Sequence, residues 1–251
     1  MLPDRRHDEI IKMLTQRGAL PLREVAAELG ISEATARRDV NRLAESGRLS
    51  RVYGGAVIKG PNEAPFAYSD GTDREQKQRI AQAAAALVSD SDTVVLDIGS
   101  TVLELARLLA GRPITVVTSN LAVYDVMKNA VRTELILLGG QLRRNYWSTV
   151  GVLAEGAMRQ LHADIAFLGT SGVTRNGRVL DTTPIEVSIK QQMIRSSDRV
   201  ALLAAERKFP GTGLSVVCGP EDVTTLVTTV RTDETFLQEF ADAGTDIVRV
   251  P

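Results

Sequence analysis

Apolar side chains recur at helical spacing in three successive segments near the start of the chain. The first segment ends at Gly18, the second follows Pro21, and the third begins at Ser32, a residue type that caps helices well. Residues 48–57 then alternate and turn at a pair of glycines, as a short β-hairpin does. Three helices followed by a hairpin predict a winged helix-turn-helix over residues 1–58.

The third predicted helix has an apolar side and a basic side. Ala36, Val40 and Leu43 form its inner stripe, so its opposite face carries residue types that bind base edges and phosphates. The candidates for DNA contact on this helix are Ser32, Thr35, Arg37, Arg38, Asn41 and Arg42. Asp39 lies within a turn of Arg42, and we expect it to orient an arginine rather than to repel DNA. The alternative is a solvated face of a small helical bundle, but the helix-turn-helix spacing and the basic hairpin favour DNA binding.

From residue 73 onward, apolar strand-like runs alternate with helical stretches. The runs cover residues 93–98, 114–118, 134–138, 164–168, 200–203, 226–229 and 246–250. Runs that are apolar on both faces and separated by helices are typical of parallel sheets, so the pattern predicts a doubly wound, mostly parallel α/β fold. Such sheets bind ligands at the carboxyl ends of their strands.

Small and polar residues follow four of the predicted strands. Asp97-Ile98-Gly99-Ser100-Thr101 leads from a strand into a helix, where backbone N–H groups and hydroxyls can bind a phosphate. The other candidates at strand ends are Thr118, Ser119, Asn120, Gly139, Gly140 and the stretch 169–172. Each one alone is equally typical of a turn or a helix cap, but their recurrence favours ligand binding.

Composition narrows the classes of protein. The 251 residues, 43% of them hydrophobic, can bury a core, and no apolar stretch is long enough to span a membrane. The N-terminus lacks the apolar stretch of a signal peptide, so we expect a cytoplasmic protein. One cysteine and two histidines exclude an internal disulfide and a zinc site, and we expect no metal or cofactor. Cys218 lies in an apolar run and is expected to be a buried, inert thiol.

The net charge of −1 hides an uneven distribution. Residues 1–59 carry a charge of +3 and the remainder −4, and the positive excess falls within residues 32–59. A stretch rich in glycine, proline and small polar residues follows, which indicates a linker over residues 59–72. We therefore expect a DNA-binding domain over residues 1–58 and an effector and oligomerisation domain over residues 73–251.

The third helix and the hairpin carry a family resemblance. Ser32-Glu-Ala-Thr-Ala-Arg-Arg-Asp-Val40, preceded by Arg6 and Ile10 and followed by Arg51-Val-Tyr-Gly-Gly-Ala56, resembles the characteristic sequence of the DeoR family of bacterial transcription repressors. The resemblance implies that DNA is contacted by Thr35, Arg37, Arg38, Arg51 and Tyr53.

Residues 73 to about 230 also resemble this family, whose effector domain is related to ribose-5-phosphate isomerase and similar sugar-phosphate enzymes. The matching stretches include residues 97–101, 118–120, 148–151, 164–172 and 186–190. The charged candidates for a sugar-phosphate site are Lys77, Arg143, Asp181, Glu186, Lys190 and Lys208, although each alone is more typical of a surface charge. Around Lys208 the sequence Ala-Glu-Arg-Lys-Phe departs from the family pattern, which leaves open whether this lysine contacts the ligand.

The helical stretch of residues 186–190 argues against an enzyme. Isomerases similar to this domain carry an adjacent Glu-Lys pair, and here the residue before Lys190 is Ile189. The usual base is missing, although Glu186 lies one helical turn away and could substitute. Tyr146 and Trp147 either border the pocket or serve packing.

These features together predict a repressor of a carbohydrate-catabolism operon. It would form a homo-oligomer, dimer or tetramer, and a phosphorylated sugar would release it from its operator. One alternative is a sugar-phosphate isomerase or deaminase-like enzyme with an appended DNA-binding domain. Another is a constitutive DNA-binding protein whose second domain serves only assembly, and ligand-dependent release from DNA distinguishes it from the repressor.

Overall fold

The computed structural model describes residues 3–17, 19–45, 49–52, 55–57, 74–144 and 146–251. The chain divides into two compact units, Met1–Tyr68 and Ser69–Pro251, called here the N-terminal and C-terminal units. The predicted linker over residues 59–72 lies outside the described residues, as does Tyr53.

The N-terminal unit is a winged helix-turn-helix, as the sequence predicts. Its helices are α1 (Pro3–Arg17), α2 (Leu22–Leu29) and α3 (Glu33–Glu45), and its hairpin is β2 (Ser50–Val52) with β3 (Gly55–Val57). A short strand that the sequence analysis missed, β1 (Ala19–Pro21), pairs with β3 and extends the hairpin to three strands. The helices share one apolar core, in which Ile10, Val25 and Val40 are fully buried.

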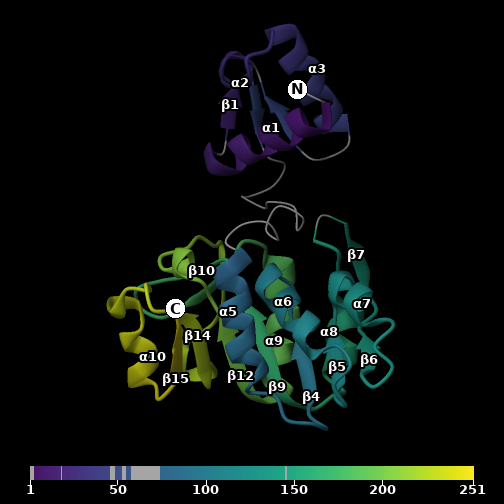
Figure 1. The fold of residues 1–251 in the computed structure, drawn as a ribbon, viewed down its shortest axis with the longest axis vertical. Coiled ribbons are helices and arrows are strands. Elements are labelled where there is room, and N and C mark those ends of the chain that lie inside the picture. The colour runs from purple at the N-terminus through teal and green to yellow at the C-terminus, as the bar shows by residue number, and fades with distance from the viewer. Residues whose placement is uncertain (1–2, 18, 46–48, 53–54, 58–73, 145) are drawn as a thin grey trace. The chain divides into compact units, whose positions relative to one another are not determined.

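Seven parallel strands form the main sheet of the C-terminal unit, which confirms the predicted α/β architecture (Figure 1). Their order across the sheet is β15-β14-β12-β9-β4-β5-β6. Their bounds are β4 Thr93–Leu96, β5 Thr115–Thr118, β6 Glu134–Leu137, β9 Ala163–Gly169, β12 Ser197–Leu203, β14 Thr225–Thr229 and β15 Asp246–Val250. Because all seven run in one direction, their carboxyl ends meet at a single edge.

Helices cover both faces of this sheet. They are α5 (Arg74–Ala85), α6 (Ser100–Leu109), α7 (Leu121–Met127), α8 (Val152–Met158), α9 (Pro184–Arg195) and α10 (Gln238–Asp242). Val95 and Leu202 belong to one buried cluster with residues of α8, α9 and α10, such as Ile189. Val94 alternates with Val95 and therefore faces the opposite side, where α5 and α6 lie side by side (Figure 1).

Two smaller β-structures escaped the sequence analysis. The hairpin of β7 (Gln141–Arg143) and β8 (Ser148–Val150) follows β6, and a three-stranded antiparallel sheet joins β10 (Gly172–Val173), β11 (Val179–Asp181) and β13 (Ser215–Cys218). Cys218 is buried, as expected, and burial raises the pKa of its thiol to about 12. No helix within the described ranges is both long and apolar enough to cross a membrane.

Candidate functional site

Helix α3 presents arginines on its exposed side. Arg37, Arg38 and Arg42 are exposed, whereas Ala36 and Val40 are fully buried, as the spacing predicts. At the start of the helix, the Ser32 hydroxyl accepts a hydrogen bond from the Thr35 backbone N–H at 3.2 Å and lies 2.9 Å from the Thr35 hydroxyl. Ser32 is therefore an N-cap as expected, and the exposed guanidinium groups suit phosphates and base edges.

Asp39 binds an arginine, but on a different helix from the one expected. Its carboxylate accepts bonds from Arg6 of α1 at 2.8 and 3.2 Å, and His7 Nε2 lies 3.2 Å away. Burial raises the pKa of Asp39, but the bonds from Arg6 and His7 outweigh this and hold it below its ordinary value. The partner is Arg6 and not Arg42, because Asp39 is only 4% exposed and lies on the side of α3 that packs on α1. The pair joins α1 to α3 and offsets the negative charge of Asp39 beside the arginine-bearing face.

The remaining candidates in the N-terminal unit are less well defined. Asn41 is half-buried, and its Oδ1 atom is buried with no hydrogen-bond partner in the described part of the chain. Arg51 belongs to β2, but its side chain is not described, and Tyr53 lies outside the described residues.

The polar residues at the end of β5 and directly after it link neighbouring strand ends by hydrogen bonds, and some of their polar atoms have no such bond among the described residues. Thr118 Oγ1 donates to the Leu96 carbonyl at 2.6 Å and accepts from the Asn120 N–H at 3.0 Å. Asn120 Oδ1 in turn caps α7 by accepting from the Ala122 N–H at 2.9 Å. Among the described residues, nothing bonds to the Ser119 hydroxyl or to Asn120 Nδ2, although both side chains are fully buried. These two groups are therefore buried and unsatisfied within the described part of the chain.

Helix α6 begins at Ser100 directly after β4, as the sequence predicts. Gly99 precedes it with φ 122°, a conformation that favours glycine, and no side chain caps the helix. Ser100 is buried and Thr101 is half-buried. Because the first N–H groups of a helix lack partners within the helix, this terminus suits an anion.

Gly140 permits a close approach of backbone, but to the chain itself. A Cβ atom there would lie 2.7 Å from the Val150 carbonyl oxygen of β8, whereas a Cβ on the exposed Gly139 would meet nothing within 4 Å. The glycine at 140 is thus explained by the packing of the β7–β8 hairpin, without a ligand.

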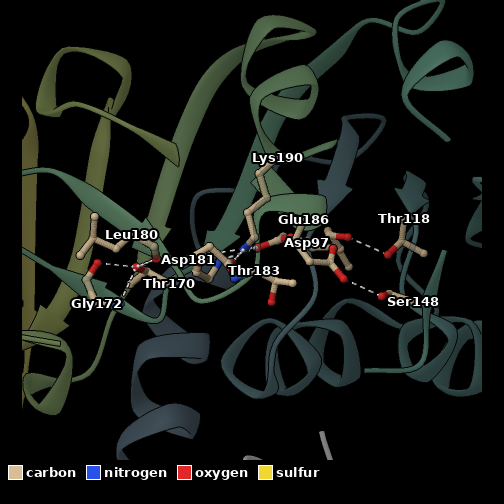
Figure 2. Close-up of polar contacts among 12 residues, drawn as sticks. Asp97, Thr118, Ser148, Thr170, Gly172, Leu180, Asp181, Thr183, Glu186 and Lys190 are labelled. Atoms are coloured by element: carbon tan, nitrogen blue, oxygen red, sulfur yellow. Dashed lines mark hydrogen bonds and ion pairs between the residues drawn. The ribbon is translucent and has the colours of Figure 1, made fainter. Parts of the chain in front are cut away.

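A buried ion pair occupies the centre of the sheet edge (Figure 2). Lys190 Nζ on α9 donates to Asp97 Oδ2 and to the Gly169 carbonyl at 3.0 Å, and lies 3.4 Å from Asp181 Oδ2. Burial alone would lower the pKa of Lys190, but the facing carboxylates of Asp97 and Asp181 raise it above its ordinary value. Burial raises the pKa of Asp97 to about 6, although the nearby ammonium group of Lys190 acts to lower it. This carboxylate is therefore mostly ionised at pH 7.

Glu186, also on α9, extends this ion pair into a network. Its Oε1 atom accepts from Arg143 Nη1 at 2.7 Å and from Ser148 Oγ at 2.9 Å, and its side chain is fully buried. Arg143 Nη2 also donates to Thr183 Oγ1 at 2.9 Å, and the Thr183 N–H donates to Asp181 Oδ1 at 3.1 Å. Five of the charged residues predicted from the sequence therefore form one continuous network between β4, the β7–β8 hairpin and α9, namely Asp97, Arg143, Asp181, Glu186 and Lys190.

Lys208 lies close enough to this network to interact electrostatically with Asp181 and Lys190. Burial lowers the pKa of Lys208 to about 8, and the positive charges of Arg207, Lys77 and Lys190 act in the same direction. Lys77 is itself only 2% exposed. A half-buried ammonium group beside other cations is stabilised by an anion, so Lys208 is suited to a phosphate.

Ser148, Thr182 and Thr183 were not among the candidates from the sequence. Thr182 and Thr183 follow β11, a strand of three residues that shows no useful periodicity, and Ser148 belongs to the equally short β8. Of the aromatic residues nearby, the Tyr146 ring lies 4.3 Å from the Arg143 guanidinium carbon and packs on it. In the described part of the chain, no three His, Cys, Asp or Glu side chains gather as a metal ion would require.

Comparisons with known proteins cover both units. The family model for the DeoR C-terminal sensor domain matches residues 72–229, and that for the DeoR-like helix-turn-helix domain matches residues 6–61. The HTH-type transcriptional regulator GolR of Listeria innocua serovar 6a is 30% identical over 247 residues, which cover 97% of each chain. The HTH-type transcriptional regulator UlaR of Shigella flexneri serotype 5b is 28% identical over 254 residues, which cover 100% of each chain.

Solved structures give a weaker likeness. Ribose 5-phosphate isomerase A from Methanocaldococcus jannaschii is 16% identical and covers 55% of both chains with a TM-score of 0.42. The eIF2B beta subunit from Chaetomium thermophilum is 16% identical and covers 68% of this chain and 54% of its own, with a TM-score of 0.45. Scores this low have no bearing on function.

Proposed function

Because this chain belongs to the DeoR family of transcriptional regulators, we propose that it represses a carbohydrate-catabolism operon and leaves its operator when a phosphorylated sugar binds. Like its relatives, which are transcriptional regulators, it is a DNA-binding regulator and not an enzyme. One observation supports a ligand above all others: buried polar atoms of Asp97, Ser119 and Asn120, which have no hydrogen-bond partner among the described residues, lie where two parallel strands end. Residues 1–58 would bind DNA, residues 59–72 would link the domains, and residues 73–251 would bind the effector and oligomerise, all in the cytoplasm where the operator lies.

For the operator, we propose contacts from the exposed side of α3 and from the wing. The residues are Ser32, Thr35, Arg37, Arg38, Asn41, Arg42, Arg51 and Tyr53. The exposure of the three α3 arginines supports this assignment, since they can reach phosphates and base edges.

For the effector, the proposed site lies at the carboxyl edge of the sheet. The phosphate would bind at the start of α6, with Gly99, Ser100 and Thr101, and near Lys208. The sugar would contact Asp97, Ser119, Asn120, Gly139, Arg143, Asp181 and Glu186. Thr118, Gly140 and Lys190, which are engaged within the protein, would act by positioning these groups.

The same geometry argues against turnover of the sugar. Ile189, next to Lys190, is fully buried and cannot move a proton. Glu186 already accepts two hydrogen bonds on Oε1, from Arg143 and from Ser148, so this oxygen is engaged within the protein. We therefore propose binding without isomerisation.

The proposed function is tested by release from DNA. Operator duplexes are first selected from random DNA with the purified protein, and release is then followed by mobility shift with a panel of sugar phosphates. A binding sugar phosphate at 100 times its Kd also stabilises the fold by about 2.7 kcal/mol, which a thermal melt detects. Operator binding that no sugar phosphate weakens would contradict the proposal and favour a constitutive DNA-binding protein.

The start of α6 gives a prediction for the phosphate. The double variant Ser100→Ala/Thr101→Ala is expected to bind the releasing sugar phosphate at least about tenfold more weakly, because hydrogen bonds to a charged group are worth about 1.5–3 kcal/mol. Operator affinity should stay unchanged, so the variant remains bound to DNA. Thr235→Ala, at an exposed threonine, is the control. Release of the double variant at the original sugar-phosphate concentration would place the phosphate elsewhere.

Exposed apolar residues support the proposed homo-oligomer. Leu142 and Trp147 in the β7–β8 hairpin are 50% and 55% exposed, and Val152 and Leu153 at the start of α8 are 81% and 72% exposed. These residues are close together in the chain, an exposed apolar cluster of this kind is typical of an interaction surface, and helix-turn-helix regulators bind paired half-sites as dimers. A second copy of the chain would cover them.

Leu153→Asp is expected to shift the protein toward a monomer of 27.1 kDa in sedimentation velocity. Aspartate in the first turn of a helix is compatible with folding, so the change should act on assembly. Val131→Asp, at a side chain that is 98% exposed outside this group, is the control. An unchanged mass for Leu153→Asp would exclude this surface from the oligomer contact.

A further inference from the structure

Five buried polar atoms in the network or beside it lack a hydrogen-bond partner in the described part of the chain. They are Asp97 Oδ1, Ser119 Oγ, Asn120 Nδ2, Thr182 Oγ1 and Glu186 Oε2. Two belong to the network itself, and the others lie on residues next to its members, since Asn120 pairs with Ser148 and Thr182 stands between Asp181 and Thr183. None of the five side chains is more than 9% exposed. A buried polar group without a partner is costly, so a bound molecule that satisfies these atoms gains affinity from each of them.

The chemistry of these atoms limits what can bind. Asp97 Oδ1 and Glu186 Oε2 belong to carboxylates and can only accept a hydrogen bond, the two hydroxyls can accept or donate, and Asn120 Nδ2 can only donate. A hydroxyl of a ligand can donate to a carboxylate and accept from an amide at once. A carboxylate of a ligand has no hydrogen to donate.

The charges of the network residues also favour a ligand group without negative charge. The network contains the carboxylates of Asp97, Asp181 and Glu186 against the cations of Lys190 and Arg143, and these cations are already paired within it. Its net charge is therefore negative, in contrast to the surroundings of Lys208, where Lys77 and Arg207 add positive charge. An anionic group would be repelled from the network and attracted to the side of Lys208.

We propose that the end of the effector remote from its phosphate is a hydrogen-bond donor without negative charge, and that Glu186 sets this specificity. The effector class is then the phosphates of aldoses, ketoses, alditols or amino sugars, and phosphates of sugar acids are rejected. The proposal rests on the proposed function, because it assumes that a phosphorylated sugar binds at this edge of the sheet.

The test compares ligands that differ only at that end. Calorimetric titrations of the full chain would use glucitol 6-phosphate against 6-phosphogluconate, and ribitol 5-phosphate against 5-phosphoribonate. Glucosamine 6-phosphate and the parent aldose phosphates complete the panel. We expect the better alditol phosphate to bind at least about 100-fold more tightly than its acid, since unpaired buried polar groups discriminate strongly. Glucosamine 6-phosphate and the aldose phosphates, which carry no negative charge at that end, should also bind more tightly than the acids.

The outcomes separate this inference from the proposed function. A sugar-acid phosphate that binds as tightly as its alditol overturns the inference and leaves the sugar-phosphate regulator standing. Failure of every sugar phosphate in the panel to bind overturns both.

A variant tests the role of Glu186. Glu186→Gln keeps an oxygen that can accept from Arg143 and Ser148 and places an amide donor where Oε2 now lies. We expect it to bind the acid at least about tenfold more tightly and the alditol more weakly, which moves the ratio toward the acid. Glu239→Gln, at an exposed carboxylate on α10, should leave the ratio unchanged. A folded Glu186→Gln protein with the original ratio would contradict the assignment.

A second variant tests the site independently in case Glu186→Gln does not fold. Thr182→Val keeps the shape of the side chain and removes its buried hydroxyl, which has no protein partner among the described residues. It should weaken alditol phosphate binding several-fold and leave inorganic phosphate binding unchanged. Equal alditol affinity in wild type and Thr182→Val would remove this hydroxyl from the site.

Discussion

Lys190→Met is expected to lower the free energy of unfolding by about 3–5 kcal/mol at pH 7, the usual cost of breaking a buried ion pair. The lysine side chain is 2% exposed and that of its partner Asp97 is 1% exposed, so water cannot replace the lost contact. Asp181 would also lose its contact with the ammonium group at 3.4 Å. Urea denaturation of the variant and the wild type measures the difference. Lys128→Met, at a lysine paired with Asp125 on the surface, should leave the free energy of unfolding nearly unchanged.

The pH dependence of this loss identifies its cause. Asp97 already has a pKa raised to about 6 by burial, and without Lys190 its pKa rises further. The folded variant then binds more protons than the unfolded chain, whose aspartates titrate near about 3.9, so its stability increases as the pH falls from 7 toward 5. The deficit relative to wild type should shrink over this range. Asp97→Asn combined with Lys190→Met should recover much of the loss, and a deficit independent of pH would rule out the buried charge as its cause.

The main sheet could be predicted from the sequence because helices cover both of its faces, so its strands are apolar on both sides. Strand β9 and residues 200–203 of β12 are apolar on both faces, and the resulting runs of apolar residues stand out along the chain. The β7–β8 hairpin and the sheet of β10, β11 and β13 were missed because their strands have two to four residues, too few for a period to show. These short strands carry or precede Arg143, Ser148 and Thr182.

The sequence identified the candidate residues one by one, but it did not show which of them form ion pairs with each other. Lys190 and Asp97 lie 93 residues apart in the sequence, and Arg6 and Asp39 lie 33 apart. A local pattern identifies a charged residue after a strand or on a helix, but it does not show which distant charge the fold brings beside it. Lys190 was therefore expected to contact a ligand, whereas the fold gives its ammonium group two carboxylates of the protein.

Arg38→Ala is expected to weaken operator binding by about 1–3 kcal/mol while the melting temperature barely moves. Arg38 is exposed on α3, next to Asp39, whose bonds to Arg6 fix this helix against α1. Loss of an exposed side chain leaves that link and the apolar core intact, so the effect should appear in DNA affinity alone. Mobility-shift titrations at fixed salt measure it, with Arg159→Ala at an exposed arginine of the C-terminal unit as a control of equal charge change.

The dependence of the DNA affinity on salt concentration and on DNA sequence then distinguishes between a phosphate and a base as the contact of Arg38. If it binds a phosphate, Arg38→Ala weakens all DNA sequences alike and reduces the slope of log affinity against log salt by about 1. If it binds a base edge, the variant keeps that slope and loses its preference at one position of the operator. Either result assigns the exposed side of α3 to DNA, because Arg159→Ala removes the same charge from the other unit and should change neither quantity. Operator affinity equal to that of wild type would instead make this side of α3 a solvated surface, and DNA recognition would then depend on other residues of α3 or on the wing.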